Sequence, residues 1–514
     1  MSKTIIIIGA GLAGLSAALQ AAENGCNVKL VSSLPSERAQ SVMAEGGINA
    51  ALNTKDENDS PEEHFTDTIK AACGLADPNA VWGMTQAAPE LVHWLLKLGV
   101  KFNMSGYDDV DLRNFGGQKK KRTAFAQSDT GKQIMTAMID AVRRKEASGM
   151  VERFSHHSFL TLRLCDNICC GCVIRDEYSQ ETVELPGDAV IVATGGMHGL
   201  FGNTTGSLSN TGEVTAELFR LGVPLANGEM IQYHPTTVKC GGKRMLISEA
   251  ARGEGGRLFA MKDGKQWYFM EEKYPELGNL MPRDITAREI WKVSHESEVF
   301  LDMTEISEEI ISNKLSGLAD DCMTYLHKDI RKEPVSVLPG IHYFMGGILV
   351  DEQHRTPIQN LCAAGECCAQ YHGANRLGGN SLLGALYGGR VAAKSACEQA
   401  DVVDLSCATQ IDFPPASQIS EIKQLNKVMQ ETMGVVRNEN TLLNGIQTVQ
   451  ALTGNLPLLG MAVLKSALAR KESRGAHWRE DYPKSNDDDY LKTTVARFDG
   501  KQIQISFVPV PERR

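Results

Sequence analysis

The stretch TIIIIGAGLAG, from Thr4 to Gly14, decides the fold of this chain. It opens with an uninterrupted apolar run from Ile5 to Ile8, which is typical of a strand buried on both faces in a parallel sheet. Gly9, Gly11 and Gly14 follow in the spacing G-x-G-x-x-G. Glycines at this spacing let the backbone approach a pyrophosphate, whose charge the free N–H groups at the start of a helix can bind.

The residues after this turn complete a strand–turn–helix–strand unit. Small residues through Glu23 predict a helix that stops at Gly25, and the segment from Asn27 to Val31 predicts a second strand. This context predicts a nucleotide-binding unit. Ser32 and Ser33 stand where NAD-binding units usually carry a ribose-binding Asp or Glu, which argues against NAD.

Two later strands are predicted in the same sheet, at either end of a long segment. The apolar residues 189–192 run into a turn at Gly195, and residues 361–364 run into a turn that contains Glu366. We therefore expect an α/β nucleotide-binding domain built from residues 1–222 and 344–405, interrupted by an inserted α+β domain of residues 223–343. Residues 406–514 follow as a C-terminal helical domain and tail, helical in pattern over 419–470 and alternating like a strand pair over 493–508.

Composition and charge exclude several classes of protein. The chain has 514 residues, of which 42% are hydrophobic and 23% charged, as is ordinary for a globular protein. Its net charge of −10 argues against nucleic-acid binding as the main task, because phosphate contacts need an excess of Lys and Arg. No run approaches the roughly 18 apolar residues of a membrane helix, so we expect no direct membrane insertion. Thirteen cysteines without disulfide-framework spacing, and no export signal, predict a cytoplasmic location.

One cysteine cluster allows two interpretations. Cys169, Cys170 and Cys172 resemble a fragment of a metal or iron–sulfur site, but they lie in a predicted hairpin. Because Cys packs well as a small hydrophobe, we favour packing and predict no metal site.

Polar and charged residues gather near both ends of the insertion. Singly, each favours a structural role; Glu249 and Arg252, for instance, have the spacing of an ordinary helical ion pair. Together they favour a ligand site, because ligands bind in clefts between domains and Arg can hold carboxylates with two parallel hydrogen bonds. The clusters that carry this prediction are residues 232–236, 248–256, 282–284, 342–347 and 372–383.

With these motifs in their order along the chain, the sequence resembles the flavoprotein subunits of the succinate dehydrogenase and fumarate reductase family, which includes L-aspartate oxidase. The matching motifs extend over about 480 residues. They are GAGLAG, AEGGINAAL (Ala44 to Leu52), RNFGG (Arg113 to Gly117), YHPT, SEAARGEGG, PRD, HYFMGG, AAGE, HGANRLGGNSLL and ESRGAHWREDYP (Glu472 to Pro483).

The resemblance implies a Rossmann-like FAD-binding domain, with the insertion as a mobile capping domain that closes over the substrate. Glu213 stands where the family usually has Asp, so its contact to FAD is expected but its reach is open. The FAD-binding residues implied are Gly9, Ala10, Gly11, Ala13, Gly14, Ser32, Ser33, Gln40, Ser41, Gly46, Gly47, Ala193, Thr194, Gly195, Glu213, Glu366, Ser381 and Leu382.

The resemblance also implies the chemistry, in which a small unsaturated dicarboxylate such as fumarate receives a hydride and a proton. Arg283 would be the proton donor, refilled through Glu249 and Arg252. This role does not follow from first principles, because Arg is normally charged at all pH values and a His is the more usual acid. The alternative is that Arg283 only holds a carboxylate electrostatically. The implied substrate-binding residues are His234, Ser248, His342, Arg376, Phe115 and Gly379.

Two departures from the family pattern narrow the prediction. Gln40 replaces the His that many members join covalently to the flavin, so we expect non-covalent FAD and a tilt toward reduction. Phe115 stands where aspartate oxidases carry a Glu for the substrate ammonium group, which favours a dicarboxylate without an amine. L-Aspartate oxidase, a reductase of another 2-enoate and a non-catalytic flavin subunit stay open as alternatives.

The electron source is not visible in the sequence. A partner subunit, a diffusible donor and free reduced flavin all remain open. The ESRGAHWREDYP segment and helical tail resemble members that dock an iron–sulfur subunit, so we expect such a partner or another electron-transfer subunit. Contact with a membrane would then come only through partner subunits.

Overall fold

A parallel five-stranded sheet, called the central sheet below, forms the core of the nucleotide-binding part of the computed structural model, which describes residues 2–106, 109–399, 411, 413 and 418–514. The strand order is β20-β10-β1-β2-β6, and every neighbouring pair is parallel. The apolar run predicted as a strand is β1, flanked by β10 and β2, in the middle of the sheet. The strands are β1 (Thr4–Ile8), β2 (Asn27–Ser32), β6 (Val151–Ser155), β10 (Ala189–Val192) and β20 (Leu361–Ala363).

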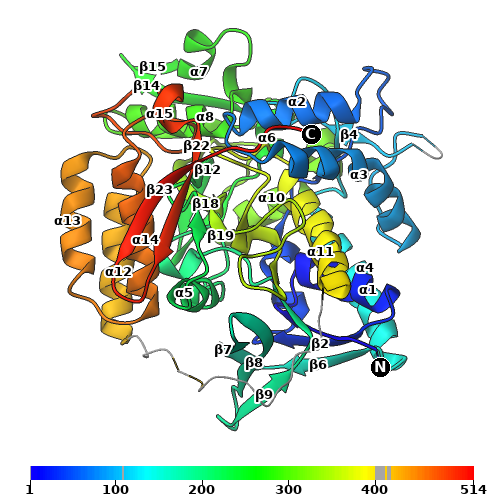
Figure 1. The fold of residues 1–514 in the computed structure, drawn as a ribbon. Helices are drawn as coiled ribbons and strands as arrows, with labels where there is room; N and C mark the ends of the chain where they lie inside the picture. The colour runs from blue at the N-terminus through cyan, green and yellow to red at the C-terminus, as the bar shows by residue number, and fades with distance from the viewer. Residues whose placement is uncertain (1, 107–108, 400–410, 412, 414–417) are drawn as a thin grey trace.

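The two faces of this sheet are covered differently. Because side chains alternate along a strand, Ile5 and Ile7 pack into a core with the helices, whereas Ile6 and Ile8 pack into a second core. The helical face carries α1 (Leu12–Glu23), α3 (Pro78–Lys97), α4 (Thr130–Ala147) and α11 (Asn380–Gln399), of which α1 and α11 lie side by side (Figure 1). The other face carries an antiparallel sheet of β7 (His157–Cys165), β8 (Ile168–Asp176) and β9 (Thr182–Pro186).

The segment between β10 and β20 forms small mixed α and β layers, part of which lies at the top of Figure 1. One antiparallel sheet combines β12 (Ile231–Cys240), β13 (Lys243–Leu246) and β18 (Leu338–Phe344). A second combines β14 (Arg257–Lys262), β15 (Lys265–Trp267), β16 (Val299–Asp302) and β17 (Val335–Ser336). The helices are α6 (Glu249–Gly253), α7 (Phe269–Lys273), α8 (Arg283–Val293), α9 (Glu308–Lys314) and α10 (Ser316–Asp321).

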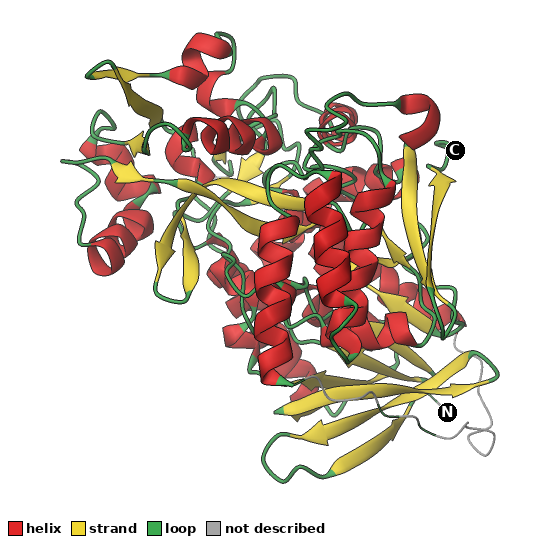
Figure 2. Cartoon of the chain, turned by 90° about the vertical axis from the view of Figure 1, so that its left-hand side faces the viewer, coloured by secondary structure: helices red, strands yellow, loops and turns green. Residues whose placement is uncertain are grey.

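Three long helices near the C-terminus pack against the sheet domain, and Figure 2 shows them at the centre of the view. They are α12 (Ile419–Thr432), α13 (Glu439–Val449) and α14 (Asn455–Ala469), and they share a core with α5 (Glu213–Arg220). The predicted strand pair of the tail is present as β22 (Lys492–Phe498) and β23 (Ile503–Pro509). It extends a sheet with β11 (Leu225–Ala226), β19 (Gly347–Leu349) and β21 (Cys368–Ala369).

The remaining elements lie beside α11 and the tail. They are α2 (Pro61–Ala71), α15 (Asp487–Tyr490) and a small sheet of β3 (Ile48–Asn49), β4 (Leu112–Arg113) and β5 (Thr123–Ala124). The predicted α/β fold class, with its helical C-terminal part, is confirmed. The boundaries at 222, 343 and 405 stay predictions, and the last of them falls outside the described residues. None of the described helices has the length and apolar character needed to cross a membrane.

Candidate active site

A large cavity of about 560 Å³ opens between the carboxyl end of the central sheet and the inserted segment. Its walls come from the β1–α1 turn, the turn after β10, the start of α11 and the sheet that contains β12 and β18. Of the residues predicted for FAD, substrate or catalysis, all but Gly14 and Arg252 line this cavity. One cavity therefore collects residues that are up to 373 positions apart, from Gly9 to Leu382.

The glycine turn brings the backbone close to its neighbours, which explains why larger residues do not fit. A Cβ at Gly9, whose φ is +109°, would lie 2.3 Å from the carbonyl oxygen of Ala193. A Cβ at Gly14 would lie 1.8 Å from the carbonyl oxygen of Gly9, so Gly14 acts beneath the cavity as a packing residue. Gly11 caps α1 without a side-chain hydrogen bond, and the Leu12 N–H donates to Ser41 Oγ at 3.3 Å. This helix start suits an anionic pyrophosphate.

Side chains from distant segments complete the proposed FAD half of the cavity. Gln40 Oε1 accepts a hydrogen bond from the Ser207 N–H at 2.5 Å, which ties the turn after β2 to the loop before α5. Glu366 Oε1 accepts from the Phe344 N–H at 3.1 Å. Glu213 lies at the start of α5, where partial burial raises the pKa of its carboxyl. The other predicted contacts here are Ala10, Ala13, Ser32, Ser33, Gly46, Gly47, Thr194, Gly195, Ser381 and Leu382.

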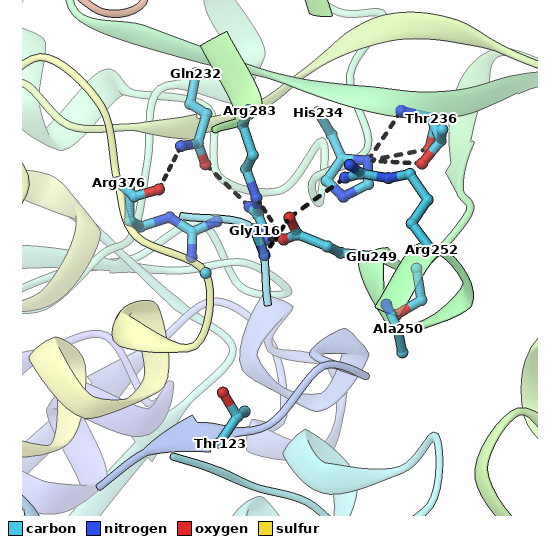
Figure 3. Close-up of polar contacts among 12 residues, drawn as sticks. Gly116, Thr123, Gln232, His234, Thr236, Glu249, Ala250, Arg252, Arg283 and Arg376 are labelled. Atoms are coloured by element: carbon cyan, nitrogen blue, oxygen red, sulfur yellow. Dashed lines mark hydrogen bonds and ion pairs between the residues drawn. The ribbon is translucent and has the colours of Figure 1, made fainter. Parts of the chain in front are cut away.

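At the opposite half, one carboxylate joins two arginines (Figure 3). Arg283 donates to Glu249 Oε2 from Nε at 2.8 Å and from Nη2 at 2.5 Å. Glu249 Oε1 accepts from Arg252 Nη2 at 3.3 Å and from the Gly116 N–H at 3.2 Å. Burial alone would raise the pKa of Glu249, but Arg283 and Arg252 outweigh it and hold that pKa below its usual value. Arg252 lies behind Glu249 and also donates to the Asn279 carbonyl at 2.6 Å.

Two histidines flank this ion-pair group. His234 and His342 have ring centroids 5.1 Å apart. Burial, followed by the charge of Arg283, lowers the pKa of each imidazole well below its usual value. His342 Nδ1 lies 2.8 Å from the Thr205 hydroxyl, and His234 Nδ1 contacts Thr236. Both imidazoles are therefore neutral near pH 7 in this state and can donate N–H groups, but they do not supply a positive charge.

Arg376 provides another cation beside Arg283 in this half of the cavity. Its guanidinium lies over the Tyr343 ring, 4.3 Å from the centroid. Burial and the neighbouring Arg283 lower the pKa of Arg376 to about 9. Three buried guanidinium groups, those of Arg252, Arg283 and Arg376, near the single Glu249 carboxylate leave an excess of positive charge, which an anionic ligand would stabilise.

The remaining predicted substrate residues shape the walls. Ser248 lies at the N-cap of α6, where its hydroxyl accepts from the Ala250 N–H at 3.4 Å. Phe115 is 2% exposed, and a Cβ at Gly46 would lie 2.8 Å from its ring. Gly379 has a φ of +83°, and a Cβ there would lie 2.1 Å from Asn49 Oδ1. The site is thus tightly packed around the polar groups.

Two polar residues of the site, Gln232 and Glu45, were assigned no individual role from the sequence. Gln232 accepts from Arg283 Nη1 at 3.0 Å and donates to Asn375 Oδ1 and to the Arg376 carbonyl. Its place directly before YHPT was the available signal. Glu45 lines the cavity, and its burial, followed by the nearby Asp321, raises the pKa of its carboxyl to about 8.

The cysteine cluster, Cys169, Cys170 and Cys172, does not line the cavity. Cys169 and Cys172 are in the apolar core beneath the central sheet, and burial raises the pKa of the Cys169 thiol to about 12. Within the described ranges, no three His, Cys, Asp or Glu side chains are grouped so that they could hold a metal ion. The packing interpretation accounts for Cys169 and Cys172.

Fold and cavity together define a Rossmann-like α/β protein with a large ligand site at the carboxyl end of its parallel sheet. Residues 4–382 match the family described as FAD binding domain, and residues 452–513 match the family described as fumarate reductase flavoprotein C-term. The succinate dehydrogenase flavoprotein subunit of Bacillus subtilis is 38% identical, over 100% of this chain and 98% of that protein. The 8-methylmenaquinol:fumarate reductase flavoprotein subunit of Wolinella succinogenes is 32% identical, over 100% of this chain and 92% of that protein.

The fold agrees with these sequence matches. An E. coli quinol fumarate reductase structure superposes with a TM-score of 0.90 at 27% identity, covering 99% of this chain and 97% of that one. The chain belongs to the succinate dehydrogenase/fumarate reductase flavoprotein subunit family. It is accordingly an FAD-dependent oxidoreductase.

Proposed function

We propose that this chain reduces fumarate, or a similar small unsaturated dicarboxylate, with non-covalently bound FAD and with Arg283 as the proton donor. The observation that carries the proposal is the Arg283–Glu249–Arg252 group, buried between two neutral imidazoles and Arg376. FAD, when bound, supplies the hydride, and the product gains one proton from the protein. The residues proposed to hold FAD are those of the glycine turn and the cavity half that contains Gln40 and Glu366.

The histidines support Arg283 as the acid. A general acid has to carry its proton at the working pH, and the lowered pKa values of His234 and His342 leave both imidazoles without the extra proton. We assign them to hydrogen bonding of substrate carboxylates, together with Arg376 and Ser248. Phe115 and Gly379 would exclude water and limit the length of the dicarboxylate that can bind.

The same contacts supply a route for the proton. Arg283 already donates two hydrogen bonds to Glu249, so after Arg283 gives a proton to the product, the Glu249 carboxylate can take a proton from Arg252 and pass it to Arg283 without movement of heavy atoms, while Arg252 regains its proton from solvent. Glu249 in turn accepts from Arg252. We therefore assign Glu249 and Arg252 as the groups that refill Arg283.

Gln40 supports the non-covalent attachment, because an amide side chain lacks the nucleophilic ring nitrogen of His. The chain should lose all of its flavin to the supernatant on acid denaturation. Flavin that stays with the precipitated polypeptide would contradict this assignment.

The succinate-oxidising direction is the second candidate, favoured by the name of the 38% identical Bacillus subtilis relative. The Bacillus subtilis and Wolinella succinogenes relatives are both named as flavoprotein subunits. We therefore propose that this chain also works with an electron-transfer partner, such as an iron–sulfur subunit. Capture of a tagged chain from its native cell should then recover a subunit with iron–sulfur absorption. If the chain is recovered alone and is fully active, the proposal of a partner subunit is wrong.

The deciding experiment assays the purified, FAD-loaded chain with reduced viologen and fumarate, with succinate and an artificial acceptor, and with aspartate and oxygen. We expect fumarate turnover to exceed succinate oxidation, and no release of ammonia from aspartate. Faster succinate oxidation would select the second candidate, and ammonia release would establish an oxidase. No turnover of any of the three would support another 2-enoate or a non-catalytic subunit.

A further inference from the structure

A buried histidine outside the predicted set lies behind the FAD half of the cavity. His198 is completely buried in the turn that follows β10, and its Nε2 has no hydrogen-bond partner among the described residues. That nitrogen faces Glu366 Oε1 at 3.6 Å. Glu366 lines the cavity. A buried polar atom without a partner is rare in proteins, so its position beside a cavity-lining carboxylate calls for a functional explanation.

The contacts of the ring suit the tautomer that carries its proton on Nε2. The Thr204 hydroxyl oxygen accepts from the Gly206 N–H at 3.2 Å and lies 3.0 Å from His198 Nδ1. With its oxygen engaged by Gly206, the hydroxyl hydrogen can bind Nδ1, and the ring proton is then on Nε2, toward Glu366. The ring itself is held edge-on to Phe344, with centroids 4.9 Å apart. A Cβ at Gly206 would lie 2.1 Å from the ring, so this packing leaves no space for a side chain there.

The carboxylate is approached from the same side by a second donor. The Phe344 N–H donates to Glu366 Oε1, the oxygen that His198 Nε2 faces. Two donors directed at one oxygen leave the other oxygen for a ligand in the cavity. The adjacent Thr205 contacts His342, so the Thr204–Thr205 dipeptide joins the FAD half of the cavity to its substrate half.

We propose that His198 is a positioning residue, whose Nε2–H holds Glu366 in the orientation that contacts FAD and moderates the negative charge beside the flavin. The inference rests on the proposed function only in assigning Glu366 to bound FAD. It does not depend on the substrate, the direction of the reaction or the proton donor. Without the donor, the carboxylate would present more of its charge to the flavin, and the extra electrons of the reduced flavin would be disfavoured.

The test uses the full chain loaded with FAD and compares His198→Leu with His198→Gln. The two replacements fill the site similarly, but only Gln keeps an N–H donor. The readouts are the Kd for FAD and the flavin midpoint potential, neither of which requires turnover of any substrate. We expect His198→Leu to weaken FAD binding about tenfold, because the Glu366 carboxylate loses the N–H group that faces it, and to lower the potential. His198→Gln should restore most of both.

Two further variants separate positioning from simple packing. In a Glu366→Gln background, His198→Leu should change neither the Kd nor the potential further, because the negative charge that it moderates is gone. His477→Gln is the matched control, since His477 is as fully buried but lies outside the cavity lining. It should leave both FAD readouts unchanged, whatever its effect on the melting temperature.

Several results would overturn the proposal. They are an unchanged Kd and potential in His198→Leu, a His198→Gln variant as impaired as the Leu variant, and effects that persist fully in the Glu366→Gln background. Any of these would leave His198 with a packing role. Fumarate turnover by the wild-type chain is measured separately, so a wrong substrate assignment would not be confused with a wrong role for His198.

Discussion

At the scale of single residues, Arg283 has enough N–H groups to bind neighbouring side chains and a ligand at the same time. A guanidinium has five N–H donors, and three hydrogen bonds from Arg283 reach Glu249 and Gln232. The donors that remain can reach a ligand in the cavity. If Arg283 transfers a proton, Arg283→Ala should lower kcat for fumarate by about 10³-fold, with a smaller change in KM.

If Arg283 only holds a carboxylate electrostatically, the Arg283→Ala variant should instead raise KM and leave kcat nearly unchanged. Steady-state kinetics with reduced viologen distinguish the two roles. Arg283→Lys is the matched variant, because it keeps the positive charge but loses the bidentate hydrogen bonding to Glu249. The flavin absorption spectrum of each variant checks that the cofactor site is intact.

Arg376 gives a separate prediction about binding. Its guanidinium is buried, and the pKa lowered to about 9 shows that this environment disfavours its charge until an anion is present. Arg376→Gln should raise the inhibition constant of malonate, a dicarboxylate that is not turned over, by about 10²-fold. An unchanged inhibition constant would place the dicarboxylate elsewhere in the cavity.

The motif residues could be predicted to share a site, but their supporting contacts could not. Gln232 meets Arg283 across 51 positions and reads in the sequence only as a polar residue before a motif. Glu45 lies within AEGGINAAL, yet its raised pKa depends on Asp321, which is 276 positions away. Such pairings depend on how separate segments pack, and periodicity or spacing does not carry that information.

At the scale of elements, the β1–α1 turn can be tested directly, because the structure shows that there is no space for a side chain at Gly14. Gly14 lies within helix α1, where Ala is normally the better helix former by about 1 kcal/mol. Here the added Cβ would lie 1.8 Å from the Gly9 carbonyl oxygen, so the helix has to move away from the strand. We expect Gly14→Ala to destabilise the protein by about 1–3 kcal/mol and to weaken FAD binding.

Thermal unfolding and FAD titration measure both effects. Gly242→Ala is the control, since a Cβ there meets no atom within 4 Å. It should leave stability within about 0.5 kcal/mol of the wild type. A Gly14→Ala variant that is more stable than the wild type would show that the close approach does not constrain the turn.

Most elements were predictable, because each has its own local pattern. The Ile run, the strand pair of the tail and the three C-terminal helices all lie where hydrophobic periodicity indicated. The partners of the short strands were not predictable. β11 has two residues, and it joins β19 to β22 across about 120 and 270 positions of sequence. A two-residue strand has no periodicity, and only its neighbours define it.

At the scale of the whole molecule, Glu45 lies where four other segments of the chain meet. Its carboxyl contacts Ser248 at the start of α6, and it lies near Asp321 of α10, Asp129 before α4 and Arg113 of β4. Burial and the two aspartates raise its pKa, which the Ser248 hydrogen bond and Arg113 only partly offset. The ionisation of Glu45 therefore reports on how these parts pack together.

The linkage between this pKa and stability has a definite sign. The pKa rises from 4.5 in the unfolded chain to about 8 in the folded one, so the folded protein binds the proton more tightly. The stabilisation from Glu45 is complete below about pH 4.5 and is lost as the pH rises to about 8. Glu45→Gln keeps a neutral side chain of the same shape at every pH. The melting temperature of the FAD-loaded wild type, measured relative to this variant, should fall by about 2 °C or more between pH 6 and pH 9. Parallel curves for the two proteins would mean that Glu45 ionises normally and that the surrounding segments do not enclose it.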